Sequence, residues 1–142
     1  MKTTISTLVI SLCLFTSCKK DKNTCSVTVA SIAGTYSFGK FEVGSNGVYQ
    51  DITSQFESCQ LDDKLILDAN GTSTYQDLGV VCNPNGTETG TWSISADGKM
   101  TVQTGTDTDV SSADVSFDCT TLVLTADGPL SGYKFRSTIK KN

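Results

Sequence analysis

The sequence predicts an all-β domain in which short antiparallel strands follow one another along the chain. From Ala33 onward, apolar and polar residues alternate in short runs, which is typical of strands with one buried face. Trp92 and Ile94, for example, flank a serine and place two large side chains on one face of a strand. The second observation is a repeated turn of the type Ala-Asn-Gly or Ala-Asp-Gly, found at 69–71, 96–98 and 126–128. Such turns connect the strands of hairpins, so the pattern indicates an antiparallel meander.

The first seventeen residues have the layout of a secretory signal peptide. Lys2 supplies a basic start, an apolar run extends from Ile5 to Phe15, and small residues precede Cys18. This ending resembles the lipobox of bacterial lipoproteins. The resemblance implies that the chain is cut before Cys18, which then carries a diacylglycerol and an N-acyl lipid. An uncleaved membrane anchor or a buried helix is the alternative, but the run has about half of the roughly 20 residues that a spanning helix needs.

Removal of residues 1–17 leaves a polar segment, 18–30, which we expect to be a lipid-anchored tether, and one domain over 31–142. The domain is expected to contain strands near 34–43, 47–53, 63–68, 72–78, 88–95, 99–104, 110–118, 120–125 and 132–139. The stretch from Thr53 to Cys59 fits one helical turn with Ser54 as its N-cap. Because no long helix covers them, the strands either close on themselves or form two packed sheets.

The cysteine content predicts disulfides. Cys13 leaves with the signal peptide and Cys18 takes the lipid, so four cysteines remain in the domain. These are Cys25, Cys59, Cys82 and Cys119. An even number in an exported chain indicates two disulfides, with three possible pairings.

One pairing follows from the register of a hairpin, in which facing residues have a constant sum of positions. The midpoint between Cys59 and Cys82 falls on the Asn-Gly turn at 70–71, so both cysteines lie just beyond the same two strands. We therefore expect Cys59–Cys82, which leaves Cys25–Cys119 to fix the tether to the domain. Free thiols or a metal–thiolate cluster are the alternatives, and a cluster requires closer spacing than these four cysteines have.

Composition argues against most catalytic and metal chemistry. The chain has 11 basic and 15 acidic residues, a net charge of −4 and no histidine. This balance disfavours nucleic-acid binding, and the lack of histidine excludes Ser-His-Asp triads and His-bearing zinc sites. Asp107, Asp109 and Asp114 could offer oxygen ligands to Ca²⁺, but a solvated loop explains them better. Asp62 and Asp63 are adjacent and point to opposite faces of a strand, so they do not form a catalytic pair. We expect no enzyme, no metal and no cofactor besides the lipid on Cys18.

A larger set of motifs resembles a known family. The motifs are Ala33-Gly34-Thr35-Tyr36, the Cys59/Asp62/Asp63 start, Leu65-Ile66-Leu67, Asp68-Ala69-Asn70-Gly71-Thr72, Tyr75, Cys82 and Gly90-Thr91-Trp92-Ser93-Ile94. Together they resemble the lipocalin-like domain of small Bacteroidota lipoproteins over roughly residues 31–139. Tyr36 stands where that family's opening motif carries a tryptophan. The resemblance implies an up-and-down antiparallel β-barrel of about eight strands on a lipid anchor, and it brings no catalytic residues.

The barrel interior is the candidate ligand site. Its candidate lining residues are Tyr36, Phe38, Leu65, Leu67, Tyr75, Trp92, Ile94, Phe117, Leu122, Leu124, Tyr133 and Phe135. An eight-stranded barrel is either filled by side chains or holds one small ligand. We expect Trp92 and Phe135 to lie in the core in either case.

Two functions are compatible with this sequence. One is a lipid-anchored envelope protein that binds a small apolar ligand. The alternative is a filled barrel that docks an envelope partner through an exposed apolar patch. The expected partners are the membrane and either a ligand or an envelope protein, and not nucleic acid. Lys19 follows the lipidated cysteine, which by resemblance to bacterial sorting favours the outer membrane and leaves the periplasmic or surface face open.

Overall fold

The computed structural model describes residues 25–105 and 111–142, and the structural statements below refer to these residues. They form nine strands, with two short α-helices and one 3₁₀ turn. The elements are α1 (Val29–Ile32), β1 (Gly34–Ser45), β2 (Val48–Asp51), the 3₁₀ turn η1 (Thr53–Gln55), α2 (Ser58–Leu61), β3 (Lys64–Leu67), β4 (Thr72–Gln76), β5 (Glu88–Ile94), β6 (Lys99–Thr104), β7 (Ser111–Phe117), β8 (Thr121–Asp127) and β9 (Lys134–Lys141).

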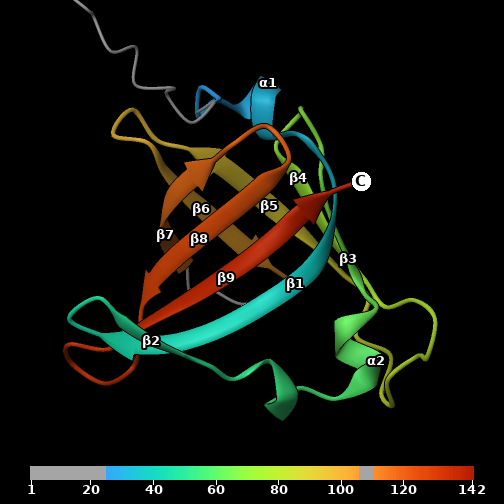
Figure 1. The fold of residues 1–142 in the computed structure, drawn as a ribbon. Coiled ribbons are helices and arrows are strands. Elements are labelled where there is room, and N and C mark those ends of the chain that lie inside the picture. The colour runs from blue at the N-terminus through green and yellow to red at the C-terminus, as the bar shows by residue number, and fades with distance from the viewer. Residues whose placement is uncertain (1–24, 106–110) are drawn as a thin grey trace, which may run out of the picture.

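The strands form a closed antiparallel barrel. Each of β3 to β8 pairs with the next strand along the chain, and β1 pairs with β3 on one side and with β9 on the other. The β1–β9 pairing closes a barrel of eight strands, and β2 is an additional strand on the end of β1 (Figure 1). The predicted up-and-down barrel is confirmed, and the two-sheet alternative is wrong, because full closure leaves the eight strands without an open edge.

A β-bulge in β1 changes which side chains face inward. Phe38 pairs with Ile139 and Lys40 with Thr138, so Gly39 is an extra residue in the ladder. A side chain at Gly39 would lie 3.1 Å from the Thr138 carbonyl oxygen, which explains the glycine. Because of the bulge, Phe38 and Phe41 both face the interior although they are three residues apart.

The predicted helical turn at 53–59 is two separate turns, η1 and α2. Ser54 is not an N-cap, because it lies inside η1. Glu57 caps α2 instead, and the Gln60 side chain accepts a hydrogen bond from the Glu57 backbone N–H at 3.0 Å. The chain breaks into turns here because it must leave β2 and return to the barrel at β3.

One end of the barrel is closed by the segment that precedes β1. Ile32, at the end of α1, is fully buried, and the Tyr36 hydroxyl donates a hydrogen bond to the Ile32 carbonyl. Burial raises the pKa of Tyr36 to about 12. Residues 25–30, the last part of the predicted tether, lie against this end, where the Cys25 N–H donates to the Phe117 carbonyl at 3.1 Å. We call this end of the barrel the closed end.

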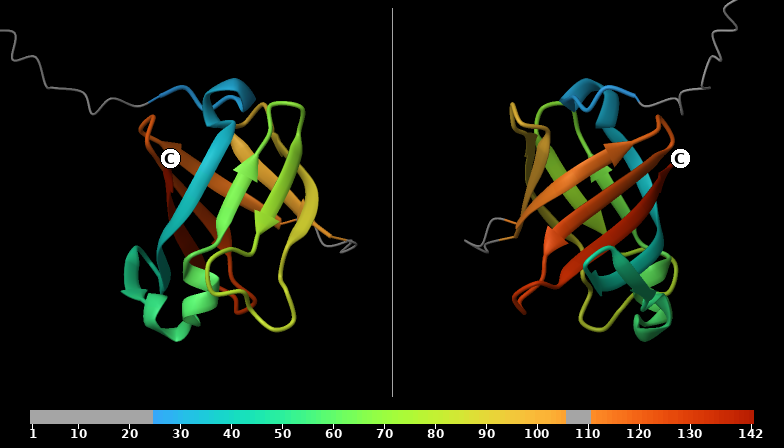
Figure 2. Two further views of the ribbon diagram at one scale, coloured as in Figure 1. Left: turned by 90° about the vertical axis from the view of Figure 1, so that its right-hand side faces the viewer. Right: turned by 60° about the vertical axis from the view of Figure 1, so that its left-hand side comes forward.

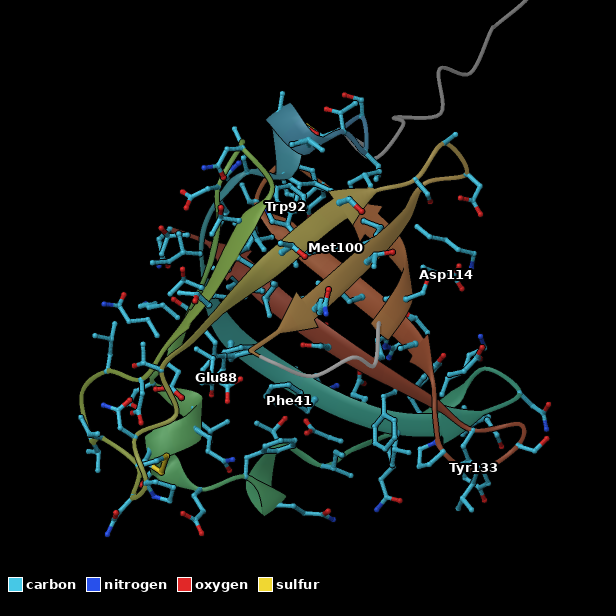
Figure 3. The ribbon with its side chains drawn as sticks, turned by 180° about the vertical axis from the view of Figure 1, so that it is seen from behind. Phe41, Glu88, Trp92, Met100, Asp114 and Tyr133 are labelled. Carbon is cyan, nitrogen blue, oxygen red and sulfur yellow. A yellow bond between two sulfur atoms is a disulfide. The ribbon has the colours of Figure 1, made fainter. Side chains whose placement is uncertain are left out.

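The hydrophobic core belongs to the closed half of the barrel. It consists of Ile32, Tyr36, Leu65, Leu67, Trp92, Met100, Phe117, Leu122 and Ile139. Figure 3 shows Trp92 and Met100 toward α1, with Phe41 and Glu88 nearer the other end. In the part of the chain that the structure describes, no helix is long and apolar enough to cross a membrane.

Candidate functional site

The loops at the other end of the barrel form the candidate site. The β1–β2 hairpin, the segment with η1 and α2, the β4–β5 loop (77–87) and the β8–β9 turn (128–133) all lie at the end opposite α1 (Figure 2). We call this the open end, because inner-face side chains are exposed there. The register pairs Glu88 with Tyr75 and Phe135 with Ala126, which places both on the inner face. Glu88 is nevertheless exposed, and Phe135 is 43% exposed.

Four aromatic side chains form a row on one wall of the open end. The ring centroids are 5.8 Å apart for Tyr75 and Phe38, 5.4 Å for Phe38 and Phe41, and 4.2 Å for Phe41 and Phe56. β1 supplies the two middle members through its bulge, and β4 and the segment after η1 supply the others. All four are only partly buried. This aromatic row therefore offers ring surface to a ligand that enters the open end.

Tyr75 is fixed by a buried carboxylate. Its hydroxyl donates to Asp63, which is only 1% exposed and also accepts the Leu78 N–H at 3.0 Å. Burial and the hydrogen bond to Asp63 raise the pKa of Tyr75 well above its usual value, so the phenol stays neutral. The ring is thus a rigid end of the aromatic row.

The β4–β5 loop is held by carboxylates as well as by a disulfide. Asp62 accepts the Val80 N–H at 2.9 Å, and Asp77 accepts the N–H groups of Cys82 at 3.1 Å and Gly86 at 2.8 Å. The sequence pattern did not predict a structural role in this loop for Asp62 or Asp63, and it did not single out Asp77. The missed signal is the β3–β4 register, in which Lys64 faces Gln76, so that Asp63 and Asp77 occupy the next facing positions.

Both predicted disulfides are present. Cys59 bonds to Cys82 and Cys25 to Cys119. The strand register differs by one position from the one that the Cys59–Cys82 midpoint predicts. The bond still forms because both cysteines lie outside the strands, Cys59 in α2 and Cys82 in the β4–β5 loop.

The sequence of this barrel matches a known domain family. Residues 32–124 match the lipocalin-like domain. The chain belongs to this lipocalin-like family. No curated protein and no solved structure matches the chain.

In this lipocalin-like barrel, the predicted lining residues fall into three groups. Tyr36, Leu65, Leu67, Trp92, Phe117 and Leu122 are buried in the core. Phe38, Tyr75, Ile94 and Leu124 are partly buried. Tyr133 and Phe135 are exposed, by 47% and 43%. The predicted core position of Trp92 is correct. That of Phe135 is wrong, because Phe135 lies near the start of β9, at the open end and outside the hydrophobic core.

The described residues of the lipocalin-like domain form no pocket, either in the core or at the open end. A ligand that enters at the open end, against the aromatic row, would therefore have to displace side chains there. The same end carries the six large apolar side chains that are exposed in the described part of the chain. They are Val48, Val80, Val81, Leu130, Tyr133 and Phe135.

The predicted candidates for metal binding do not gather. Asp107 and Asp109 lie outside the described residues, and Asp114 forms an ion pair with Lys99 on the outer face. Within 25–105 and 111–142, no group of three or more histidine, cysteine or acidic side chains is placed to hold a metal ion.

A buried ion pair stabilises the strands beneath the β1–β2 hairpin. Glu42 is 5% exposed, and its carboxylate accepts hydrogen bonds from Arg136 Nε at 2.7 Å and from Lys40 Nζ at 2.8 Å. The Arg136 guanidinium lies 3.8 Å from the centre of the Tyr49 ring, which it covers. The hydrogen bonds from Arg136 and Lys40 lower the pKa of Glu42 to about 2.

We expect Glu42→Gln to lower the free energy of unfolding at pH 7 by about 2 kcal/mol, because the variant loses the ion pairs with Arg136 and Lys40. The loss is moderate because solvent screens these two partly exposed cations. The folded-state pKa of Glu42 lies below its unfolded value, so its contribution is complete above the unfolded pKa and is lost as the pH falls toward 2. Urea unfolding of wild type and variant from pH 7 to pH 2.5 measures how this contribution depends on pH. The difference between wild type and variant should shrink with falling pH, and a constant difference would contradict the assignment.

Proposed function

We propose that this protein is an exported, lipid-anchored envelope protein whose barrel binds a small, neutral, mostly apolar ligand at its open end. The observation that carries the proposal is the aromatic row, in which Tyr75, Phe38 and Phe41 face inward from β4 and β1 and yet remain only partly buried. Ring surface left accessible in this way gains free energy when an apolar ligand covers it. No catalytic step and no cofactor are proposed.

The charges on the inner face favour a neutral ligand over a fatty acid. Among the described strands, the register places one basic side chain on this face, Lys141, which pairs with Tyr36 at the closed end. Its Nζ donates to the Ser31 carbonyl at 2.8 Å. At the open end, the charged side chain that the described strands place on the inner face is instead Glu88. On this face of the described strands, a ligand carboxylate would therefore meet a like charge and no cation.

The ligand proposal is tested with the fluorescent probe N-phenyl-1-naphthylamine. We expect the double variant Phe41→Leu/Phe56→Leu to bind the probe about tenfold more weakly than wild type, because it loses two rings of the aromatic row. Val123→Ala, on the outer face of β8, is the matched control and should bind as wild type does.

If wild type and the double variant bind the probe equally, the aromatic row is not the binding site. If wild type does not bind it, the alternative of a docking module is favoured. The six exposed apolar side chains at the open end support that alternative.

The anchor is proposed to be a lipid on Cys18, with the outer membrane favoured. Cys25 lies seven positions after Cys18, and its disulfide to Cys119 ties it to the closed end. At most about 3.5 Å per residue, this segment spans roughly 25 Å. The closed end is then held near the membrane, and the open end is left to receive the ligand.

The anchor is tested by metabolic labelling with an alkyne fatty acid in a bacterial host. We expect Cys18→Ser to abolish the label and to leave the chain uncleaved, since the lipidated residue is lost. Cys13→Ser is the matched control, because this cysteine lies inside the apolar run and should not affect labelling. Equal labelling of the Cys18→Ser variant would refute lipidation at this position.

A further inference from the structure

Ser73 is a buried polar side chain without a partner. It lies in β4, its exposed fraction is zero, and its hydroxyl makes no hydrogen bond. The other buried polar side chains of the described residues are Glu42, Asp63 and Asp77, and each has hydrogen-bond partners. Buried hydroxyl groups are nearly always paired, because an unpaired one loses its hydration without compensation. The exception at Ser73 requires an explanation.

Ser73 lies at the inner end of the aromatic row. It is two residues from Tyr75 on the same strand, so both side chains face the interior. Its facing partner on β3 is Leu67, and its facing partner on β5 is Gly90, which has no side chain. Along the inner face, the rings of Phe41, Phe38 and Tyr75 thus follow one another from the open end toward the level of the Ser73 hydroxyl.

A resident water does not account for the hydroxyl well. A buried water requires two to four polar partners. The ladder neighbours of Ser73, Leu67 and Gly90, offer no polar side chain, and the Tyr75 hydroxyl is already bonded to Asp63. The hydroxyl is thus available to a polar atom that a ligand brings with it.

We propose that Ser73 is the polar anchor of the ligand site and that the ligand is a flat aromatic or polycyclic compound with one hydroxyl or carbonyl group at its leading end. This inference rests on the proposed binding function and names the ligand class. The rings of the ligand lie against Phe38 and Tyr75, and the polar end forms a hydrogen bond with the Ser73 hydroxyl. Tyr75 is held by Asp63, so Phe38 is the ring that moves to admit the ligand.

The test uses two probes that differ only in one hydroxyl, 2-naphthol and naphthalene. The protein is the full chain carrying Cys18→Ser with both disulfides formed, and affinities are measured by fluorescence titration. We expect wild type to bind 2-naphthol five- to tenfold more tightly than naphthalene. Ser73→Ala should remove this preference and leave the affinity for naphthalene unchanged.

A second measurement concerns the unliganded protein. We expect Ser73→Ala to melt a few degrees above wild type, because the variant no longer buries an unpaired hydroxyl. Ser116→Ala is the matched control: this serine faces outward from β7 and is exposed, so its substitution should change neither the melting temperature nor the probe preference. If Ser73→Ala does not fold, Ser73→Cys replaces it, since a thiol is a weaker donor of similar shape.

The outcomes separate the anchor from the binding function. If wild type binds both probes equally, binding stands and the anchor is refuted. An equal loss of affinity for both probes in Ser73→Ala indicates packing alone and also refutes the anchor. A lower melting temperature for Ser73→Ala shows that the hydroxyl is paired in the free protein, which removes the basis of the inference. If wild type binds neither of these probes but binds N-phenyl-1-naphthylamine, the anchor fails and the binding function stands. If it binds none of the three probes, the proposed function and the anchor fail together.

Discussion

We expect the variant Cys25→Ala/Cys119→Ala to lose more stability than any other change at the surface of the barrel. The disulfide joins residues that are 94 positions apart, and a cross-link over a loop of this size contributes about 4.7 kcal/mol in the chain-entropy model. The Cys59–Cys82 bond joins residues 23 positions apart, for which the same model gives about 3.4 kcal/mol. Urea unfolding of both double variants at pH 7 measures the two losses.

The local consequences of the two variants should also differ. Without its disulfide, Cys25 keeps its backbone hydrogen bond to Phe117 and its packing against the core but loses the covalent link, so the segment that carries Ile32 into the core is expected to open more often. When Cys59–Cys82 is removed, the β4–β5 loop keeps the hydrogen bonds that its N–H groups donate to the carboxylates of Asp62 and Asp77. Hydrogen exchange should therefore increase around α1 in the first variant and much less in the loop of the second. A larger loss of stability for Cys59→Ala/Cys82→Ala would contradict this ranking.

The features that the sequence predicts correctly are local ones. The Asn-Gly and Asp-Gly turns determine which strands are neighbours, and a hairpin register follows from the positions around its turn. This is why the Cys59–Cys82 bond could be expected from sequence spacing. Closure of the barrel was predicted from the family motifs. It depends on the pairing of β1 with β9, which are nearly a whole chain apart, so no local sequence pattern indicates it.

The candidate site depends on features that spacing does not reveal. The bulge at Gly39 brings Phe38 and Phe41 to the same face, whereas strict alternation would separate them. The strand register turns Phe135 inward, as it would a core residue. Phe135 is exposed because it lies near the open end of the barrel. Ser73 looks like an ordinary polar strand residue in the sequence, and only the packing around it shows that its hydroxyl is buried without a partner.

We expect Trp92→Ala to lower the free energy of unfolding by about 4 kcal/mol. Trp92 is 3% exposed in the core of the closed half, and its removal leaves a cavity that the rigid barrel cannot collapse. The substitution also leaves the Asp68 carbonyl without the hydrogen bond that the Trp92 Nε1–H donates at 2.8 Å. Trp92→Phe keeps most of the ring but not the donor, so we expect a loss of about 2 kcal/mol. Chemical unfolding followed by circular dichroism measures both variants.

Comparison of Trp92→Phe with Phe41→Leu tests whether stability and binding belong to different halves of the barrel. Phe41 is only partly buried, so its truncation to leucine should cost less than about 1 kcal/mol of stability while it weakens probe binding. Trp92→Phe should have the opposite profile, because Trp92 lies on the closed side of the interior and does not belong to the aromatic row. If each variant lost both stability and probe affinity, the open end would be part of the same core. The partly buried rings there could then not be interpreted as a separate ligand site.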